Sequence, residues 1–255
     1  MQREEFLQQL WLDYIHRHPE VGMLRLWPID APTEYLTLLT LNLAPFAVED
    51  LLPNMGHLGY RPVHRYAMAD RGLLVTLLAP PDNGVWLILA ELQLGTLSRQ
   101  PCDTLQQLVE QTHYRDTRGK NLLCRGRPWP MPSWDEYSLL HAAHPLAGWI
   151  SAMGPSVHHA GFDCARLGQD ITTLDTALTT RGFKASEALQ HAVFPVSPLL
   201  EYRFYPACSQ RLPFAEGDEH RIPLGGLALL QKHLSGDHER AVELLLPHHT
   251  RCELP

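Results

Sequence analysis

The stretch Val157-His158-His159-Ala160-Gly161-Phe162 is an apolar run that is followed by an amphipathic segment. An earlier apolar run, Tyr35-Leu-Thr-Leu-Leu-Thr-Leu41, is also followed by an amphipathic segment. The two amphipathic segments end alike, at Gly59-Tyr60 and at Gly182-Phe183. Their apolar residues have helical i, i+3, i+7 spacing in both copies: Val48, Leu51 and Met55 in the first, and Ile171, Leu174 and Leu178 in the second. The sequence therefore predicts a strand followed by a helix, twice.

Three short strand-like runs follow each predicted helix. They read PVHRYAM (from Pro62), GLLVTLLAP and VWLILAEL in the first copy, and FKASEALQ, HAVFPV and LLEYRFY in the second. Apolar runs of this length between turn residues are typical of strands. We therefore predict an α+β fold in a single domain of residues 1–255, with two βαβββ modules over residues 33–94 and 157–207. Their sheets should pair into a cupped, half-open barrel, with Glu91 and Glu201 on the third strand after each helix.

Helices are predicted to flank the modules. An apolar stripe from Phe6 to Ile15 predicts a helix over residues 3–18, which Pro19 ends. A second helix is expected over 104–113, and a third over 134–153, where Ser133 and Glu136 form a capping box. The stripe on the first helix fits either a core contact or a homodimer contact.

Composition narrows the range of functions. The chain has 255 residues and a formal charge of −7, without a Lys/Arg cluster on any predicted face, so we expect no nucleic-acid partner. No apolar stretch approaches the roughly 20 residues of a membrane helix, and the N-terminus lacks the apolar core of a signal peptide. The five cysteines are scattered, which supports neither disulfides nor a zinc ribbon. We therefore expect a cytoplasmic protein without a membrane partner.

Five stretches, in this order, resemble one family: FLQQLWLDYIHRHP, LGYRPVHRYAM, LILAELQLGTLS, LAGWISAMGPSVHHAGFD and LQHAVFPVSPLLEYRF. The family is that of iron-dependent 2-oxoadipate dioxygenase/decarboxylases, also called hydroxyglutarate synthases and long catalogued as a domain of unknown function. The modules likewise resemble the vicinal-oxygen-chelate architecture. The resemblance implies Fe²⁺ held by two histidines and a carboxylate, with an arginine that binds a 2-oxo acid. Such a ligand set leaves positions open for substrate and oxygen.

Matching the family's motifs residue by residue gives a partial site. His159 matches the histidine of an Asn-His-x-Thr motif, and Glu201 matches the glutamate of a Tyr-x-Glu-Phe motif, so the resemblance implies that both bind the metal. Tyr35 and Leu39 stand where the family has its other histidine and its arginine. We therefore expect His159 and Glu201 to face one another within about 5 Å, the separation of two ligands of one ion.

Other residues are candidates to complete this site. Glu91 fits either a ligand and catalytic base or an acceptor that orients a histidine. Tyr35 fits a phenolate or substrate contact, or core packing. Arg203 has the strand parity of Glu201 and fits either a substrate carboxylate or a salt bridge. Gln190 matches a glutamine of the family and fits either a catalytic hydrogen bond or a satisfied core amide.

Three functions remain open on the sequence. The first is an Fe²⁺-dependent dioxygenase/decarboxylase of a 2-oxo acid or related small organic acid. The second is a metal-dependent isomerase or lyase of the same fold, with Glu91 or Glu201 as its base. The third is a metal-free binding or structural homologue that has lost catalysis. The absence of a histidine at position 35 and an arginine at position 39 favours the third, whereas His159 and Glu201 favour the first. We rank the first ahead and keep the other two as alternatives.

Overall fold

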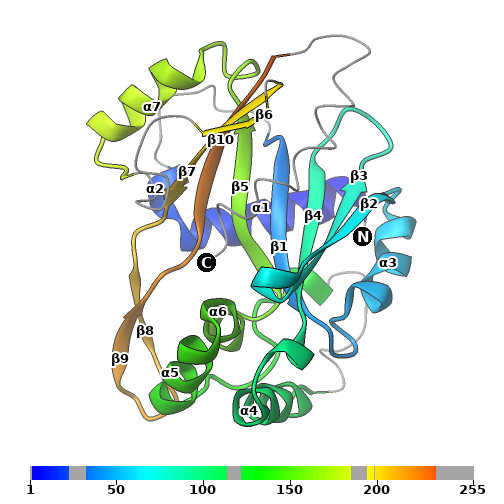
Figure 1. The fold of residues 1–255 in the computed structure, drawn as a ribbon, viewed down its shortest axis with the longest axis vertical. Helices are drawn as coiled ribbons and strands as arrows, with labels where there is room; N and C mark the ends of the chain where they lie inside the picture. The colour runs from blue at the N-terminus through cyan, green and yellow to red at the C-terminus, as the bar shows by residue number, and fades with distance from the viewer. Residues whose placement is uncertain (1, 23–32, 114–121, 185–193, 198, 234–255) are drawn as a thin grey trace.

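A computed structural model describes residues 2–22, 33–113, 122–184, 194–197 and 199–233. Its core is a mixed eight-stranded sheet in the order β2-β3-β4-β1-β5-β10-β7-β6 (Figure 1). The strands of this sheet are β1 (Tyr35–Leu41), β2 (Arg61–Met68), β3 (Leu73–Ala79), β4 (Trp86–Leu92), β5 (Ser156–Asp163), β6 (Phe194–Ser197), β7 (Leu200–Pro206) and β10 (Gly226–Lys232). The helices are α1 (Arg3–Arg17), α2 (Pro19–Gly22), α3 (Val48–His57), α4 (Arg99–Glu110), α5 (Trp134–Ala143), α6 (Pro145–Met153) and α7 (Ile171–Thr180).

The first module has the predicted order, β1-α3-β2-β3-β4. Its strand β1 is buried along its whole length and pairs in parallel with β4. Every strand residue from Tyr35 to Leu41 is buried because neighbours cover both faces, which explains why the run is almost continuously apolar.

The second module differs from the prediction in its strands. Residues 185–193, which include six of the eight residues of one predicted strand and three of the six of the next, lie outside the described residues. The third predicted run is β7, which is the second strand after α7 in the described structure and not the last. A hairpin of β8 (Gln210–Pro213) and β9 (Glu219–Ile222) then follows, and β10 closes the module at Lys232.

The two modules join through their first strands. Strand β1 pairs with β5 in antiparallel register, with Tyr35 opposite Gly161 and Thr37 opposite His159. Strand β10 then pairs in parallel with β5, as β4 does with β1. The sheet is therefore continuous across both modules, and its central strands are β4, β1, β5 and β10.

Helices pack on one face of this sheet, which we call the outer face. Trp11 of α1 contacts Phe162 of β5 with ring centroids 6.1 Å apart, and the Tyr14 hydroxyl donates to the carbonyl of Gly226 over 2.7 Å. In Figure 1, α3 lies beside β2 and α7 lies at the opposite end of the sheet. The opposite, inner face carries Tyr35 and His159, because residues that pair in register point to the same side.

The long helix predicted over 134–153 is two helices. Pro145 cannot continue α5 because it lacks a backbone N–H, so the chain turns at His144. The His144 Nδ1 then accepts from the N–H of Leu146 at the start of α6, over 3.1 Å. None of the described helices is long and apolar enough to cross a membrane.

Candidate functional site

His159 lies at the centre of the inner face and is fully buried. Next to it, the register between β1 and β5 shifts, since Thr37 pairs with His159 and Leu38 with Val157. His158 is the extra residue of this bulge. Consecutive strand residues normally point to opposite faces, and bulges commonly re-aim side chains. Here the two imidazoles meet, with His158 Nδ1 and His159 Nδ1 2.9 Å apart.

In a hydrogen bond between these two nitrogens, one must carry a proton and donate, and the other must be unprotonated and accept. Burial lowers the pKa of His158 well below its usual value, and the nearby His159, His18 and Arg17 lower it further. His158 is therefore a neutral imidazole at neutral pH. A neutral His158 can hold His159 in one tautomer, as outer-shell partners do for metal-binding and catalytic histidines.

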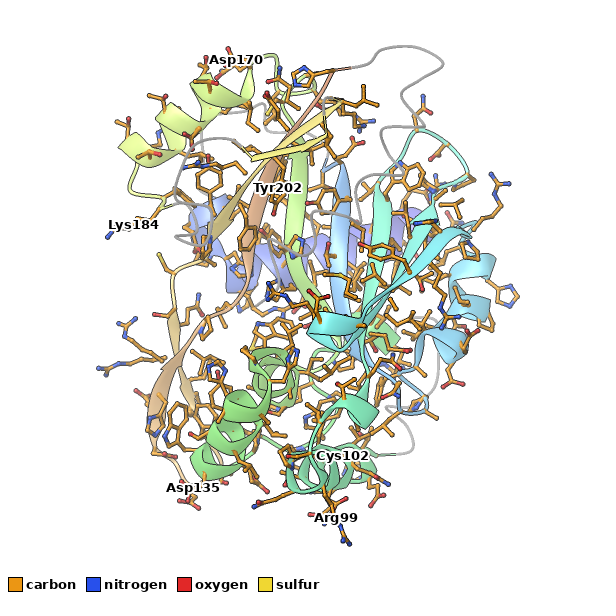
Figure 2. All side chains as sticks on the ribbon, in the orientation of Figure 1. Arg99, Cys102, Asp135, Asp170, Lys184 and Tyr202 are labelled. Carbon is orange, nitrogen blue, oxygen red and sulfur yellow. The ribbon has the colours of Figure 1, made fainter. Side chains whose placement is uncertain are left out.

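Aromatic rings flank the imidazole of His159. The Tyr35 ring lies over Gly161, where a Cβ atom would come within 2.0 Å of Tyr35 Cε1. The Phe204 ring lies over Gly226, where a Cβ atom would come within 2.7 Å of Phe204 Cζ. Both rings meet His159 edge to face, with centroid separations of 6.0 and 5.6 Å. Figure 2 shows the crowding of side chains around the central strands, with Tyr202 labelled among them.

Glu201 does not face His159. His159 pairs with Gly226 of β10, whereas Glu201 pairs with Gln231, and residues of odd and even number on one strand point to opposite faces. Glu201 therefore points to the outer face, where its Oε2 lies 3.5 Å from His233 Nε2. The expected approach of Glu201 to His159 is wrong, because the chain returns once more through β10 before the module closes.

Arg203 shares the outer face with Glu201. Its Nε lies 3.1 Å from Asp175 Oδ1 on α7, and the Tyr205 hydroxyl donates to the same carboxylate. The Arg203 side chain therefore attaches α7 to β7. Of the two roles considered for Arg203, a substrate contact or a salt bridge, the structure has the salt bridge, and its partner is Asp175. The expectation that it projects into the cup beside Glu201 is wrong for the same reason of parity.

Glu91 also belongs to the outer face. Its Oε2 accepts from the N–H of Val48, the first residue of α3, over 2.6 Å, and its Oε1 accepts from Gln93 Nε2 over 2.6 Å. The residue before α3 is Ala47, which has no side-chain oxygen to cap the helix. Glu91 supplies that cap and a negative charge at the helix N-terminus. Both of its oxygens are therefore engaged away from the inner face.

The remaining candidates lie at different places. Tyr35 is on the inner face beside His159, and it packs there as a fully buried ring. Gln190 lies outside the described residues. His64 has the inner-face register but is exposed, because β2 is an edge of the sheet.

A buried ion cluster at the end of the central strands was missed in the sequence analysis. Lys232 Nζ pairs with Glu34 Oε1 and lies 3.8 Å from Asp163 Oδ2, and Arg166 Nε lies 3.4 Å from Glu34 Oε2. Burial raises the pKa of Asp163. Lysines are rarely buried unless paired, so a lysine next to the apolar run of β10 was the available signal.

The described residues do not fit the iron centre that the family resemblance implies. A facial site needs two imidazoles and a carboxylate on one side of the sheet. His159 meets this need, but Glu91 and Glu201 both point to the outer face. Within the described parts of the chain, no three His, Cys, Asp or Glu side chains converge in a way that could hold a metal ion.

Neither a protein-family model nor a curated protein matches the chain. Solved structures do match. A Shewanella frigidimarina protein named as a hydrolase has a TM-score of 0.83 at 22% identity, covering 92% of this chain and 94% of its own. The hydroxyglutarate synthase of Oryza sativa, solved with 2-oxoadipate, has a TM-score of 0.80 at 19% identity, covering 92% and 82%.

A Ralstonia eutropha protein named as a member of the glyoxalase superfamily has a TM-score of 0.73 at 14% identity, covering 90% of this chain and 82% of its own. At these identities the likeness concerns the fold. The predicted α+β architecture is therefore confirmed, as is the resemblance of its fold to hydroxyglutarate synthase. The chain has the vicinal-oxygen-chelate fold, with one histidine at the centre of its inner face.

Proposed function

We propose that this protein is a metal-free member of the vicinal-oxygen-chelate fold that acts as a binding or structural protein and has lost the iron chemistry of its relatives. One observation carries the proposal: both carboxylates expected to complete the site, Glu91 and Glu201, point to the outer face. There Glu91 caps α3, and Glu201 faces His233.

The packing of the inner face supports the proposal. Tyr35, Thr37, Leu39 and His159 are fully buried, and the Tyr35 ring covers the backbone at Gly161. Protein cores are packed as densely as organic crystals, so a side chain in this position excludes other groups. A substrate placed beside His159 would have to displace the Tyr35 ring.

Charge on the inner face points the same way. A 2-oxo acid needs a cation for its carboxylate, typically a bidentate arginine. Lys232 is already paired with Glu34, and Arg203 is on the outer face with Asp175. Of the described residues with inner-face register, the Lys and Arg residues are Arg61, which is exposed on the edge strand β2, and the buried Lys232. A substrate carboxylate next to His159 would therefore compete with two buried protein carboxylates for Lys232.

The second candidate is the Fe²⁺-dependent dioxygenase/decarboxylase of a small organic acid. It is favoured by the inner-face position of His159 in a fold shared with hydroxyglutarate synthase. Those two features fit a catalytic relative as well, so an experiment must separate the two functions.

The test is to measure metal content and oxygen consumption on protein purified without a histidine tag. We expect substoichiometric iron after anaerobic incubation with Fe²⁺, and no oxygen uptake with 2-oxoadipate in an oxygen electrode. His159→Ala serves as the matched control. Stoichiometric iron that is lost in His159→Ala, or turnover of 2-oxoadipate by the wild type, would overturn the proposal in favour of the second candidate.

A further inference from the structure

A buried histidine lies at the corner between α1 and α2, far from the centre of the inner face. His18 ends α1 with φ −123° and ψ 63°, and its side chain is 1% exposed. Its ring packs against Tyr14 with centroids 4.6 Å apart, and its Nδ1 lies 3.8 Å from Glu20 Oε1, beyond hydrogen-bonding distance. Among the described residues, neither of its ring nitrogens has a hydrogen-bond partner. Buried polar groups normally have one, so this imidazole is an exception that needs an explanation.

The α1–α2 corner, residues 17–22, connects three parts of the fold through single hydrogen bonds. The N–H of Val21 donates to the carbonyl of His18 over 2.9 Å, which holds α2 against the end of α1. Gln210 Nε2, at the start of β8, donates to the carbonyl of Arg17 over 2.7 Å. The Arg17 guanidinium donates to Ser156 Oγ of β5 over 2.9 Å. Opening of this corner would therefore free α2 and the base of the β8–β9 hairpin.

The surroundings of His18 disfavour a proton on its ring while the corner is closed. Burial lowers the pKa of His18; the Glu20 carboxylate opposes this effect, Arg17 adds to it, and Asp13 opposes it weakly. From β5, His158 is a further imidazole within electrostatic range of His18. An open corner would instead let water solvate the imidazolium and separate it from Arg17.

We propose that His18 is a pH-sensitive hinge, whose protonation opens the α1–α2 corner and releases the base of the β8–β9 hairpin from α1. The buried ring, its two unpartnered nitrogens and the hydrogen bond from Gln210 carry the proposal. The open corner binds the proton more readily than the closed one. The closed corner is therefore stable above the ordinary histidine pKa of about 6.5 and becomes less stable as the pH falls below that value.

Amide hydrogen exchange of the full chain tests the hinge, with each rate divided by the intrinsic exchange rate at the same pH. The probes are the N–H groups of His18 and Val21, which donate to the carbonyls of Tyr14 and His18 over 2.9 Å each. We expect their opening constant to rise by up to about tenfold per pH unit below pH 6.5, because opening takes up one proton. Amides of α4, which lies away from the corner in Figure 1, should not show this slope.

Substitutions identify the group that takes up the proton. His18→Asn should remove the slope at Val21, because an amide side chain does not titrate. His16→Asn is the matched control, since His16 is exposed on the same helix and its loss should leave the slope unchanged. Glu20→Gln should also keep the slope below pH 6.5, because the imidazole is still present.

A slope that persists in His18→Asn would overturn the proposal, and a slope that disappears in Glu20→Gln would make the carboxylate the sensor and overturn it as well. If His18→Asn does not fold, the ring C–H signal of His18 is followed by NMR in the wild type. We then expect the ring to take up its proton together with the loss of protection at Val21. A His18 ring that titrates near pH 6.5 while Val21 stays protected would refute the hinge.

Discussion

The two modules attach their helices in the same way but differ on their inner faces. In the first, Glu91 of the last strand accepts from the N–H of Val48 at the start of α3 over 2.6 Å. In the second, Gln231 of the last strand accepts from the N–H of Ile171 at the start of α7 over 2.8 Å. A polar residue on the last strand therefore caps the helix in both modules. This parallel indicates that the role of Glu91 is structural.

On the inner face the modules are unequal. The described inner-face residues of β1, β3 and β4 are hydrophobic apart from Thr37, and the edge strand β2 adds only the exposed Arg61 and His64 as ionisable residues, whereas β5 and β10 contribute the buried His159, Asp163 and Lys232. A chelating site in a cup formed by two modules needs donors from both sides. The difference teaches that the two modules share the way in which a helix is attached to the outer face, whereas the buried ionisable residues of the inner face belong to the second module.

The largest expected effect comes from Glu91. Glu91→Ala leaves the buried N–H of Val48 without an acceptor and removes a charge at the N-terminus of α3, which should cost about 3 kcal/mol of unfolding free energy. Denaturant unfolding measures it. Gln231→Ala should cost only about 1 kcal/mol, because Asp170 also caps α7 through the N–H of Thr173.

The matched control for Glu91 is glutamine, which keeps the acceptor and removes the charge. We expect Glu91→Gln to cost less than half as much as Glu91→Ala. A Glu91→Ala variant as stable as the wild type would break the comparison between the modules, because Glu91 would then have no structural role to explain its position.

Overpacking at Gly161 should have the next largest effect. In Gly161→Ala the new methyl group meets the Tyr35 ring 2.0 Å from Cε1, and overpacked cores lose about 1 to 3 kcal/mol. Tyr35→Ala in the same chain removes the clash, so a double-mutant cycle should show favourable coupling between the two substitutions. Additive effects in thermal or denaturant unfolding would contradict the placement of the ring over Gly161.

Acid should destabilise the protein through His158. Its pKa is lowered by burial in the folded state, so the unfolded chain binds the proton more readily and stability falls as the pH drops below about 6.5. The slope contributed by this group is up to about 1.4 kcal/mol per pH unit. His158→Asn should flatten the pH dependence of the unfolding free energy between pH 6.5 and 5. An unchanged profile would mean that His158 is protonated in the fold.

The sequence predicted the fold well because helical spacing and continuous apolar strands are local signals. It placed α3 and α7 by the triples that begin at Val48 and Ile171, and the structure has those helices. It failed in the last strand of the second module, because β7, which was predicted to close the module, is followed by the β8–β9 hairpin and then by β10, which lies between β5 and β7.

The prediction of the candidate site was wrong for a related reason. Which face a strand residue occupies depends on pairing register, and a one-residue change of parity reverses it. Glu201 and Arg203 are therefore named correctly as polar strand residues but assigned to the wrong side. The meeting of His158 with His159 depends on a β-bulge, which leaves no chemical signal in the sequence.

The smallest expected effect tests directly whether Glu201 lies on the outer face. Glu201 is half-buried on the outer face, and its partner His233 is similarly exposed. Exposed and partly exposed pairs of this kind contribute between 0 and about 1 kcal/mol, so Glu201→Ala should change the unfolding free energy by no more than about 0.5 kcal/mol. A loss of more than about 1 kcal/mol would contradict this placement, because it would mean that Glu201 is buried against a partner other than His233.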